Sequence, residues 1–164
     1  MKFVAAGDML LQQRIQHNYP GFDELSPFIK DADGRFFNLE TTLNHEGEAS
    51  ASQLSGGTYL RVDPEVLDDL KPFGFNMMSF NNNHALDFFY DGLEATLKAA
   101  DASGLVHAGV GRNLAEASAP KFLSTVITEV STTGNLSPVK VIYTPTFVSS
   151  SVKAANASFS ISSE

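Results

Sequence analysis

Hydrophobic and polar positions along residues 1–117 follow two different periods, which predict strands and helices in turn. Short apolar runs of strand length lie at residues 3–6, 35–40, 75–80 and 105–109. Apolar residues at helical spacing lie in the segments 25–32, 63–73, 91–103 and 113–117. Since strand alternates with helix over this length, we expect an α/β fold with a parallel sheet and right-handed crossovers.

Local signals support the two longer helices. The first begins at Asp63-Pro64, since Asp caps helices and Pro is favoured at the first helical position. The second ends at Ser103-Gly104, where glycine can close the last turn. We expect the first helix to bury an apolar stripe, formed by Val66, Leu67, Leu70 and Phe73. Its acidic residues are expected on a solvated face: Asp63, Glu65, Asp68 and Asp69.

The chain changes character after residue 117. Residues 118–164 contain neither Asp nor His and are dense in Ser and Thr. The β-branched and apolar stretches 122–130 and 139–143 are strand candidates. We therefore expect one domain over residues 1–147 and a Ser-rich, disordered end over residues 148–164.

Composition narrows the classes of function. A length of 164 residues suits one domain, and 43% hydrophobic residues suit a globular protein. The net charge of −8 argues against nucleic acid or an anionic membrane surface as the main partner, because both require a basic face. No signal peptide is apparent after Met1, and no apolar run reaches 18 residues, so we expect no membrane segment in this chain. The absence of cysteine leaves the compartment open.

Polar residues follow three of the predicted strands at the point where each strand ends. Asp8 and Glu40 follow the first two strands, and Asn83-His84 follow the third. Because parallel strands bring their carboxyl ends to one edge, we expect these residues to converge there. Carboxylate and amide oxygens bind hard cations, and histidine is the usual general acid or base near neutral pH. A plain alternative for the asparagines is a polar turn.

Six blocks of the sequence stand out together: residues 7–10 (GDML), 38–40 (NLE), 74–87 (GFNMMSFNNNHALD), 92–97, 109–111 and 116–117. In these blocks, and in their order and spacing, the sequence resembles the CapA-type capsule-synthesis family. The resemblance covers residues 2–120 and implies the calcineurin-like metallophosphoesterase fold, a layered sheet with flanking helices. It also implies a role in poly-γ-glutamate or capsule synthesis, alone or in a capsule-synthesis complex.

The resemblance implies a role for five residues. Asp8 corresponds to a ligand of the first metal, and Glu40 to the bridging carboxylate, which is usually Asp. Asn83 corresponds to a ligand of the second metal, and His84 to the histidine that acts on the leaving group. Asp87 would orient His84 as a supporting carboxylate; read by itself, Asp87 is equally suited to cap the following helix.

The implied cofactor is a divalent metal. Oxygen-rich ligands favour Mn²⁺, with Fe, Zn and Mg as alternatives. Two departures from the superfamily pattern weaken the site: Leu10 stands where a histidine is usual, and no histidine follows His107. We expect the chain to represent only the N-terminal half of the full fold, or else a degenerate relative.

Two hypotheses of different class follow. The first is a metal-dependent hydrolase that cleaves a phosphate or related ester in a small-molecule or polymer substrate, through water held on the metal. The second is a non-catalytic accessory subunit of a polymer-synthesis complex, which the missing histidines would favour.

Overall fold

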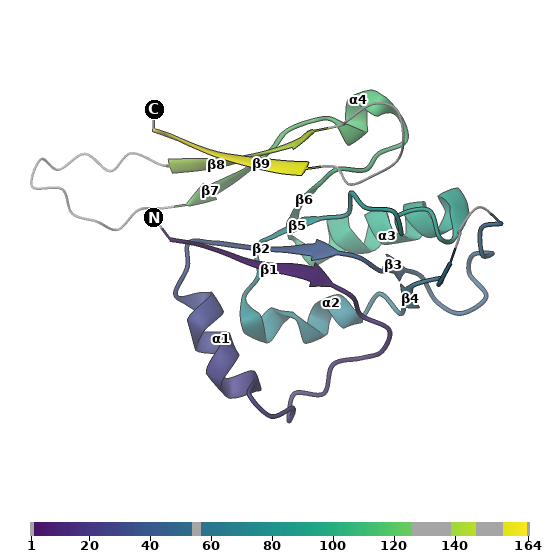
Figure 1. Cartoon of the computed structure of the whole chain (residues 1–164), viewed down its shortest axis with the longest axis horizontal. Helices are drawn as coiled ribbons and strands as arrows, with labels where there is room; N and C mark the ends of the chain where they lie inside the picture. Colours follow the sequence, from purple (N-terminus) through teal and green to yellow (C-terminus); the bar gives the residue numbers. More distant parts are fainter. Residues whose placement is uncertain (1, 54–56, 126–138, 147–155, 164) are drawn as a thin grey trace, which may run out of the picture.

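The computed structural model of the chain describes residues 2–53, 57–125, 139–146 and 156–163. Helices follow strands along residues 3–117, as the periodicity predicted, and Figure 1 shows their arrangement. The helices are α1 (Phe22–Lys30), α2 (Val66–Asp69), the short 3-10 helix η1 (Lys71–Phe73), α3 (Phe89–Ser103) and α4 (Leu114–Ala117). The strands are β1 (Phe3–Met9), β2 (Gly34–Leu39), β3 (Thr42–Leu43), β4 (Arg61–Val62), β5 (Met77–Ser79), β6 (Val106–Ala108), β7 (Lys121–Thr125), β8 (Val139–Thr146) and β9 (Asn156–Ser163).

The central sheet is parallel and has the order β1-β2-β5-β6. Helix α1 connects β1 to β2, and α3 connects β5 to β6. In this register Phe37 lies beside Met78, which lies beside His107. The α/β fold with a parallel sheet is therefore confirmed. A small parallel pair, β3 with β4, was not predicted, because two residues are too few for a periodic signal.

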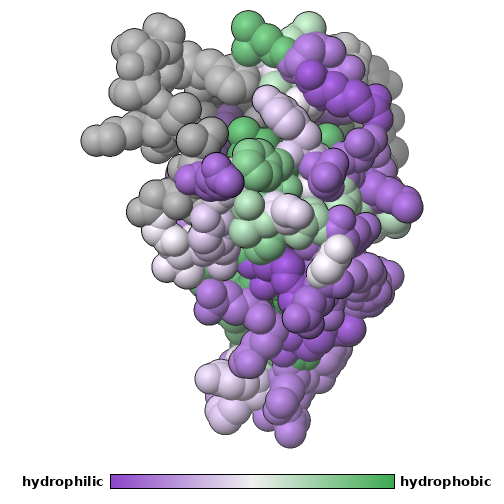
Figure 2. All heavy atoms as spheres, turned by 90° about the vertical axis from the view of Figure 1, so that its right-hand side faces the viewer, coloured by the Kyte–Doolittle hydropathy of each residue, from purple (hydrophilic) through white to green (hydrophobic). Residues whose placement is uncertain are grey.

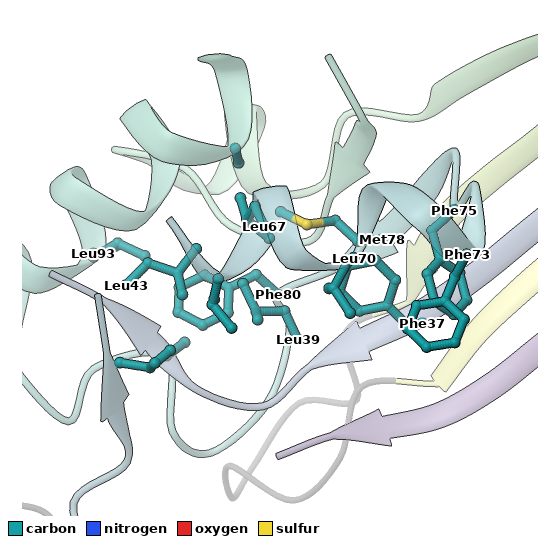
Figure 3. Packing of buried hydrophobic residues seen from close by; sticks show 14 of the residues in the cluster. Phe37, Leu39, Leu43, Leu67, Leu70, Phe73, Phe75, Met78, Phe80 and Leu93 are labelled. Carbon is teal, nitrogen blue, oxygen red and sulfur yellow. The ribbon is translucent and has the colours of Figure 1, made fainter. Parts of the chain in front are cut away.

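The sheet is covered on both faces, as parallel sheets generally are. On one face Phe37, Met78 and Phe80 are buried against the helical layer, as Figure 3 shows. That layer contains the predicted apolar stripe, whose members are all buried: Val66, Leu67, Leu70 and Phe73. On the other face Phe36 and Met77 form a second cluster. Leu123 of β7 packs against that cluster, so the antiparallel sheet covers this side.

The antiparallel sheet has the order β7-β8-β9 and lies over the central sheet in Figure 1. Its first two strands were predicted, although residues 126–130 of the first candidate lie outside the described residues. The expected disorder of residues 148–164 is wrong for residues 156–163, which form β9. The reason is visible in the sequence, since Ala157, Phe159 and Ile161 alternate with polar residues at the strand period. Residues 148–155 and 164 lie outside the described residues.

The apolar run at residues 3–6 is typical of a buried strand, but β1 is mostly exposed. Among the described strands it pairs only with β2, so it is an edge strand, and most of its residues are exposed. The register shifts between Ala5 and Asp8, where Gly7 has a φ of 78°. This bulge allows the strand to continue to Met9, so that Asp8 lies within β1 rather than beyond it.

Helices α1, α3 and α4 begin and end close to the predicted residues, but the helix predicted over residues 63–73 is divided into α2 and η1, and the N-cap residue of α2 is Glu65 rather than Asp63. Helix α2 begins at Val66, one turn after the expected start, and Gly104 closes α3 with a φ of 76°. Asp69 is buried, so the expectation of a wholly solvated acidic face is wrong for this residue. The longest described helix, α3, has 15 residues. Neither it nor any other helix in the described part of the chain is long and apolar enough to cross a bilayer.

Candidate functional site

The carboxyl ends of β1, β2 and β5 bring polar residues to one edge of the sheet. Asp8 pairs in register with Asn38, and Asn38 pairs with Ser79. Glu40 follows β2 directly, and the segment 81–84 follows β5. The arrows of β1 and β2 in Figure 1 point toward the face seen in Figure 2, the lower part of which is mostly hydrophilic.

The side chains of Asp8 and Glu40 are close neighbours at this edge. The pKa of Glu40 is raised, first because the carboxyl is partly buried and next because the negative charge of Asp8 lies nearby. A hydrogen bond between the two carboxyl groups acts in the same direction, and the charge of His84 acts in the opposite one. The convergence of Asp8, Glu40 and His84, expected from their places after the strands, is present in the structure.

Asparagine side chains link the three strand ends. Asn38 donates from Nδ2 to Oδ1 of Asp8 at 2.9 Å. Asn82 donates to Oδ1 of Asn38 at 3.3 Å and to the carbonyl of Leu39 at 2.8 Å. The backbone N–H of His84 in turn donates to Oδ1 of Asn82 at 2.9 Å. These hydrogen bonds connect β1, β2 and the turn after β5.

Asn38 and Asn82 were not assigned roles from the sequence, although both lie in the blocks that carry the family resemblance. The available signal was Asn38 itself, a polar residue within an otherwise apolar strand. Asn83, by contrast, is exposed, and its side chain makes no hydrogen bond with another described residue. The structure therefore joins Asn82 to the network and leaves the Asn83 amide available at the surface.

His84 is held by Asp87. Its Nδ1 lies 2.8 Å from Oδ2 of Asp87, and the backbone N–H of Leu60 donates to the same oxygen at 2.8 Å. Asp87 is buried, and its carbonyl accepts from the N–H of Ser52 at 2.7 Å. The alternative role of Asp87 as a helix cap is wrong, since Phe88 is the N-cap residue of α3.

The helix that follows the turn with His84 begins with a residue of unusual backbone conformation. Phe89 has a φ of 50°, the left-handed region that non-glycine residues seldom occupy. On the other side of β5, Gly109 has a φ of 104°, and an added Cβ there would lie 2.4 Å from Cβ of Asn81. Such positions persist only where the surrounding structure fixes them, and they gather at functional sites.

The donor set determines which cation would fit. Among the described residues, no group of three or more His, Cys, Asp or Glu side chains is arranged to hold a metal ion. Asp8 and Glu40 supply two neighbouring carboxylates, and the pKa of Glu40 is raised by partial burial and by the charge of Asp8. They fit a hard divalent cation whose other ligands are amide oxygens and water, and they do not fit a complete two-metal centre.

Comparison with known proteins agrees with this architecture. Residues 2–150 match the family described as bacterial capsule synthesis protein PGA_cap. The match covers most of the chain, and the chain therefore belongs to this family of capsule synthesis proteins.

Individual relatives are longer than this chain. Two uncharacterized proteins of Sinorhizobium fredii, y4sH and y4uA, are each 39% identical over 127 residues, which is 74% of this chain and 27% of theirs. The capsule biosynthesis protein CapA of Bacillus anthracis is 24% identical over 119 residues, 69% of this chain and 29% of CapA. The chain thus spans a little over a quarter of the length of the relatives it matches.

Proposed function

We propose that this protein acts in the synthesis of a bacterial capsule polymer of the poly-γ-glutamate type, and that Asp8 and Glu40 bind a divalent cation for hydrolysis of a phosphate or related ester. The observation that carries the proposal is the pair of neighbouring carboxyl groups. Partial burial and the charge of Asp8 raise the pKa of Glu40, which means that the ionised form of Glu40 is energetically disfavoured at this position. A bound cation would stabilise the ionised carboxylates. Carboxyl groups with perturbed pKa values are concentrated at functional sites.

The cation would be held mainly by carboxylate oxygens. Asn38 orients Asp8 through its hydrogen bond, and Asn83 is an exposed residue on the turn after β5. Oxygen ligands of this kind favour Mn²⁺ or Mg²⁺ over softer metals. When bound, such an ion supplies a water molecule of lowered pKa and positive charge for a phosphoryl oxygen.

His84 is arranged to move a proton at this edge. With Nδ1 directed to the Asp87 carboxyl, the other ring nitrogen, Nε2, is the one left to act toward a substrate. The hydrogen bond from Leu60 to Asp87 fixes the orientation of the ring from behind. In the proposed reaction His84 protonates the leaving group while Asp87 holds the imidazole in place.

A second function is favoured by one observation. Among the described residues, no group of three or more His, Cys, Asp or Glu side chains is arranged to hold a metal ion. Such a site suits a non-catalytic accessory subunit of a polymer-synthesis complex, in which the edge binds a cation or ligand without turnover.

Calorimetric titration with Mn²⁺ separates these functions. We expect saturable binding by the full chain, with a Kd below about 1 mM (about −4 kcal/mol). Asp8→Asn should weaken this binding at least tenfold, whereas Asp68→Asn, which changes an exposed carboxylate on α2, should leave it unchanged. Absence of saturable binding by the folded chain would contradict the metal site.

Hydrolysis is then tested on bis-p-nitrophenyl phosphate with Mn²⁺ present. Loss of turnover in His84→Gln, with Mn²⁺ binding retained, would support the hydrolase. Metal binding without turnover on this ester or on activated phosphate monoesters would favour the accessory function.

A further inference from the structure

Two residues that precede β4 in the chain hold Asp87 by its backbone and by its side chain. The backbone N–H of Ser52 donates to the carbonyl of Asp87 at 2.7 Å. The backbone N–H of Leu60 donates to Oδ2 of the same residue at 2.8 Å. Asp87, Ser52 and Leu60 are all buried, with 2%, 3% and 3% of their surface exposed, so water does not compete for these hydrogen bonds.

The side chain of Tyr59 connects these two contacts. Its hydroxyl donates to the carbonyl of Ser52, and Leu60 is the next residue in the chain. The three hydrogen bonds therefore form a closed cycle, the Asp87 cycle, which starts at the backbone carbonyl of Asp87 and returns to its carboxyl group. The cycle restrains both the backbone of Asp87 and the rotation of its side chain, because a change in either would break a hydrogen bond.

The aromatic ring of Tyr59 packs beside the same position. It meets Phe88 edge to face, with ring centroids 6.1 Å apart, a favourable geometry for two aromatic rings. Phe88 follows Asp87 directly and is the N-cap residue of α3. The ring and the hydroxyl of Tyr59 thus make separate contacts, which substitution by phenylalanine can distinguish.

The β3–β4 pair also holds His84. The hydroxyl of Thr42, a fully buried residue of β3, donates to the carbonyl of His84 at 3.0 Å. The pair is itself attached to α3, which lies beside it in Figure 1, because the N–H of Leu43 donates to Oγ1 of Thr96 at 2.8 Å. Residues in and next to this pair therefore contact both His84 and Asp87.

We propose that Tyr59 is a positioning residue of the candidate site, whose hydroxyl closes the Asp87 cycle and thereby selects the tautomer of His84. The inference rests on the proposed function, in which His84 moves the proton. Because a carboxylate only accepts hydrogen bonds, Oδ2 of Asp87, 2.8 Å from Nδ1 of His84, favours the neutral ring with its proton on Nδ1. Nε2 is then the nitrogen that gains and releases a proton.

Opening the cycle should weaken this selection. Without the Tyr59 hydroxyl, the Asp87 carboxyl can rotate away from Nδ1, and the tautomer with its proton on Nε2 becomes accessible. In that tautomer the neutral ring has no lone pair on Nε2, so His84 cannot take up a proton on that nitrogen.

The test uses the full chain without metal or substrate and compares it with Tyr59→Phe, which removes only the hydroxyl. Nitrogen chemical shifts of the His84 ring, measured by NMR in its neutral form, report which nitrogen carries the proton. We expect the Nδ1–H tautomer in the wild type and a mixture of both tautomers in Tyr59→Phe. Hydrogen exchange at the Ser52 and Leu60 amides should become about tenfold faster.

Two further variants make the test specific. Tyr90→Phe removes the hydroxyl of a tyrosine that is 73% exposed on α3, and should leave the tautomer and the exchange rates as in the wild type. In an Asp87→Asn background, Tyr59→Phe should have no further effect on the tautomer, because the carboxylate through which the hydroxyl acts is gone.

An unchanged His84 tautomer in Tyr59→Phe would overturn the proposal, even with faster amide exchange, since Tyr59 would then serve stability alone. Unchanged exchange at both amides, or equal changes in Tyr90→Phe, would overturn it as well. These readouts need neither Mn²⁺ nor an ester. A failure here therefore leaves the proposed function to its own test, and absence of Mn²⁺ binding would count against that function while leaving the role of Tyr59 in place.

Discussion

Two carboxyl groups of this protein have opposite surroundings. Asp69, at the end of α2, accepts from Nε and Nη2 of Arg14 at 2.6 Å each and from the N–H of Ile15 at 3.0 Å. These bonds, that of Arg14 foremost, lower the pKa of Asp69. Glu40, at the end of β2, meets partial burial and a second carboxyl group, and its pKa is raised.

This difference distinguishes a carboxyl group that stabilises the fold, Asp69, from one that is available to a ligand, Glu40. The Arg14–Asp69 pair fastens the segment after β1 to the helical layer, so its charges are satisfied within the fold. Glu40, by contrast, lies at the end of β2 beside the carboxyl group of Asp8, and its pKa is raised. A carboxyl group with a raised pKa at an accessible edge is typical of a site that binds a ligand, and Glu40 is such a group at the strand ends.

The largest expected effect compares two glycines with positive φ. Gly109→Ala should lower the free energy of unfolding by about 3 kcal/mol, because φ is 104° and the new Cβ would meet Cβ of Asn81 at 2.4 Å. Gly104→Ala, where nothing lies within 4 Å, should lose only about 1 kcal/mol. Urea denaturation measures the free energy of unfolding of both variants. Equal losses would show that the backbone around Gly109 can shift to accommodate the added Cβ.

The next largest change in stability is expected when the Arg14–Asp69 ion pair is broken. Asp69→Asn should lower the free energy of unfolding by about 2 kcal/mol, because it weakens three charge-assisted hydrogen bonds to a buried group. Asp68→Asn, exposed on the same helix, should change it by less than about 0.5 kcal/mol. A similar loss in both would remove the distinction between paired and solvated carboxylates.

The pH dependence of that loss has a definite sign. Because folding lowers the pKa of Asp69, its stabilisation is complete above the ordinary aspartate pKa of about 3.9 and disappears as pH falls through the folded value. The difference between wild type and Asp69→Asn should stay constant from about pH 7 to 5 and shrink below about pH 4. Urea denaturation across this range measures it, and a difference that grows in acid would contradict the assignment.

Asn38 tests the network that orients the site. Asn38→Ala removes the donor to Asp8 and the acceptor for Asn82, and should weaken Mn²⁺ binding about tenfold. Asn113→Ala, which changes the cap of α4, is the control and should leave Mn²⁺ binding unchanged. Unchanged Mn²⁺ binding in Asn38→Ala would show that Asp8 is positioned by the strand alone.

The smallest expected change in stability is that of Glu40→Gln, and its sign should reverse when Mn²⁺ is bound. Because folding raises the pKa of Glu40, its contribution to stability is fully present below the ordinary glutamate pKa of about 4.3 and is lost as pH rises through the folded value. Glu40→Gln should therefore raise the free energy of unfolding at pH 7 by about 0.5 kcal/mol, and by nothing near pH 3. With saturating Mn²⁺, thermal unfolding should instead favour the wild type.

Much of the fold followed from local patterns. The strands that became β2, β5 and β6, the apolar stripe of α2 and η1, and the end of α3 at Gly104 were all predictable, because periodicity and caps act over a few residues. The family also followed from the sequence, since several separate blocks agree in order and spacing, and the family match over residues 2–150 confirms it.

Other features needed contacts between distant residues. The periodicity did not show that β1 is an edge strand, because the number of neighbours that a strand has depends on the rest of the sheet. Asp69 was read as solvated because its partner, Arg14, lies 55 residues away. Asn38 and Asn82 look like ordinary turn or strand residues until the register of three strands brings them together.

The sequence by itself determined the order of strands and helices, the family, and the residue types that gather after the strands. Only the tertiary structure decided which carboxyl group is paired, as Asp69 is with Arg14, which one has a raised pKa, as Glu40 has, and that most residues of β1 are exposed. The physical reason is that electrostatic cost and burial are properties of neighbours in space. The hydrophobic pattern fixes which face of an element turns inward, whereas its final surroundings depend on every element packed around it.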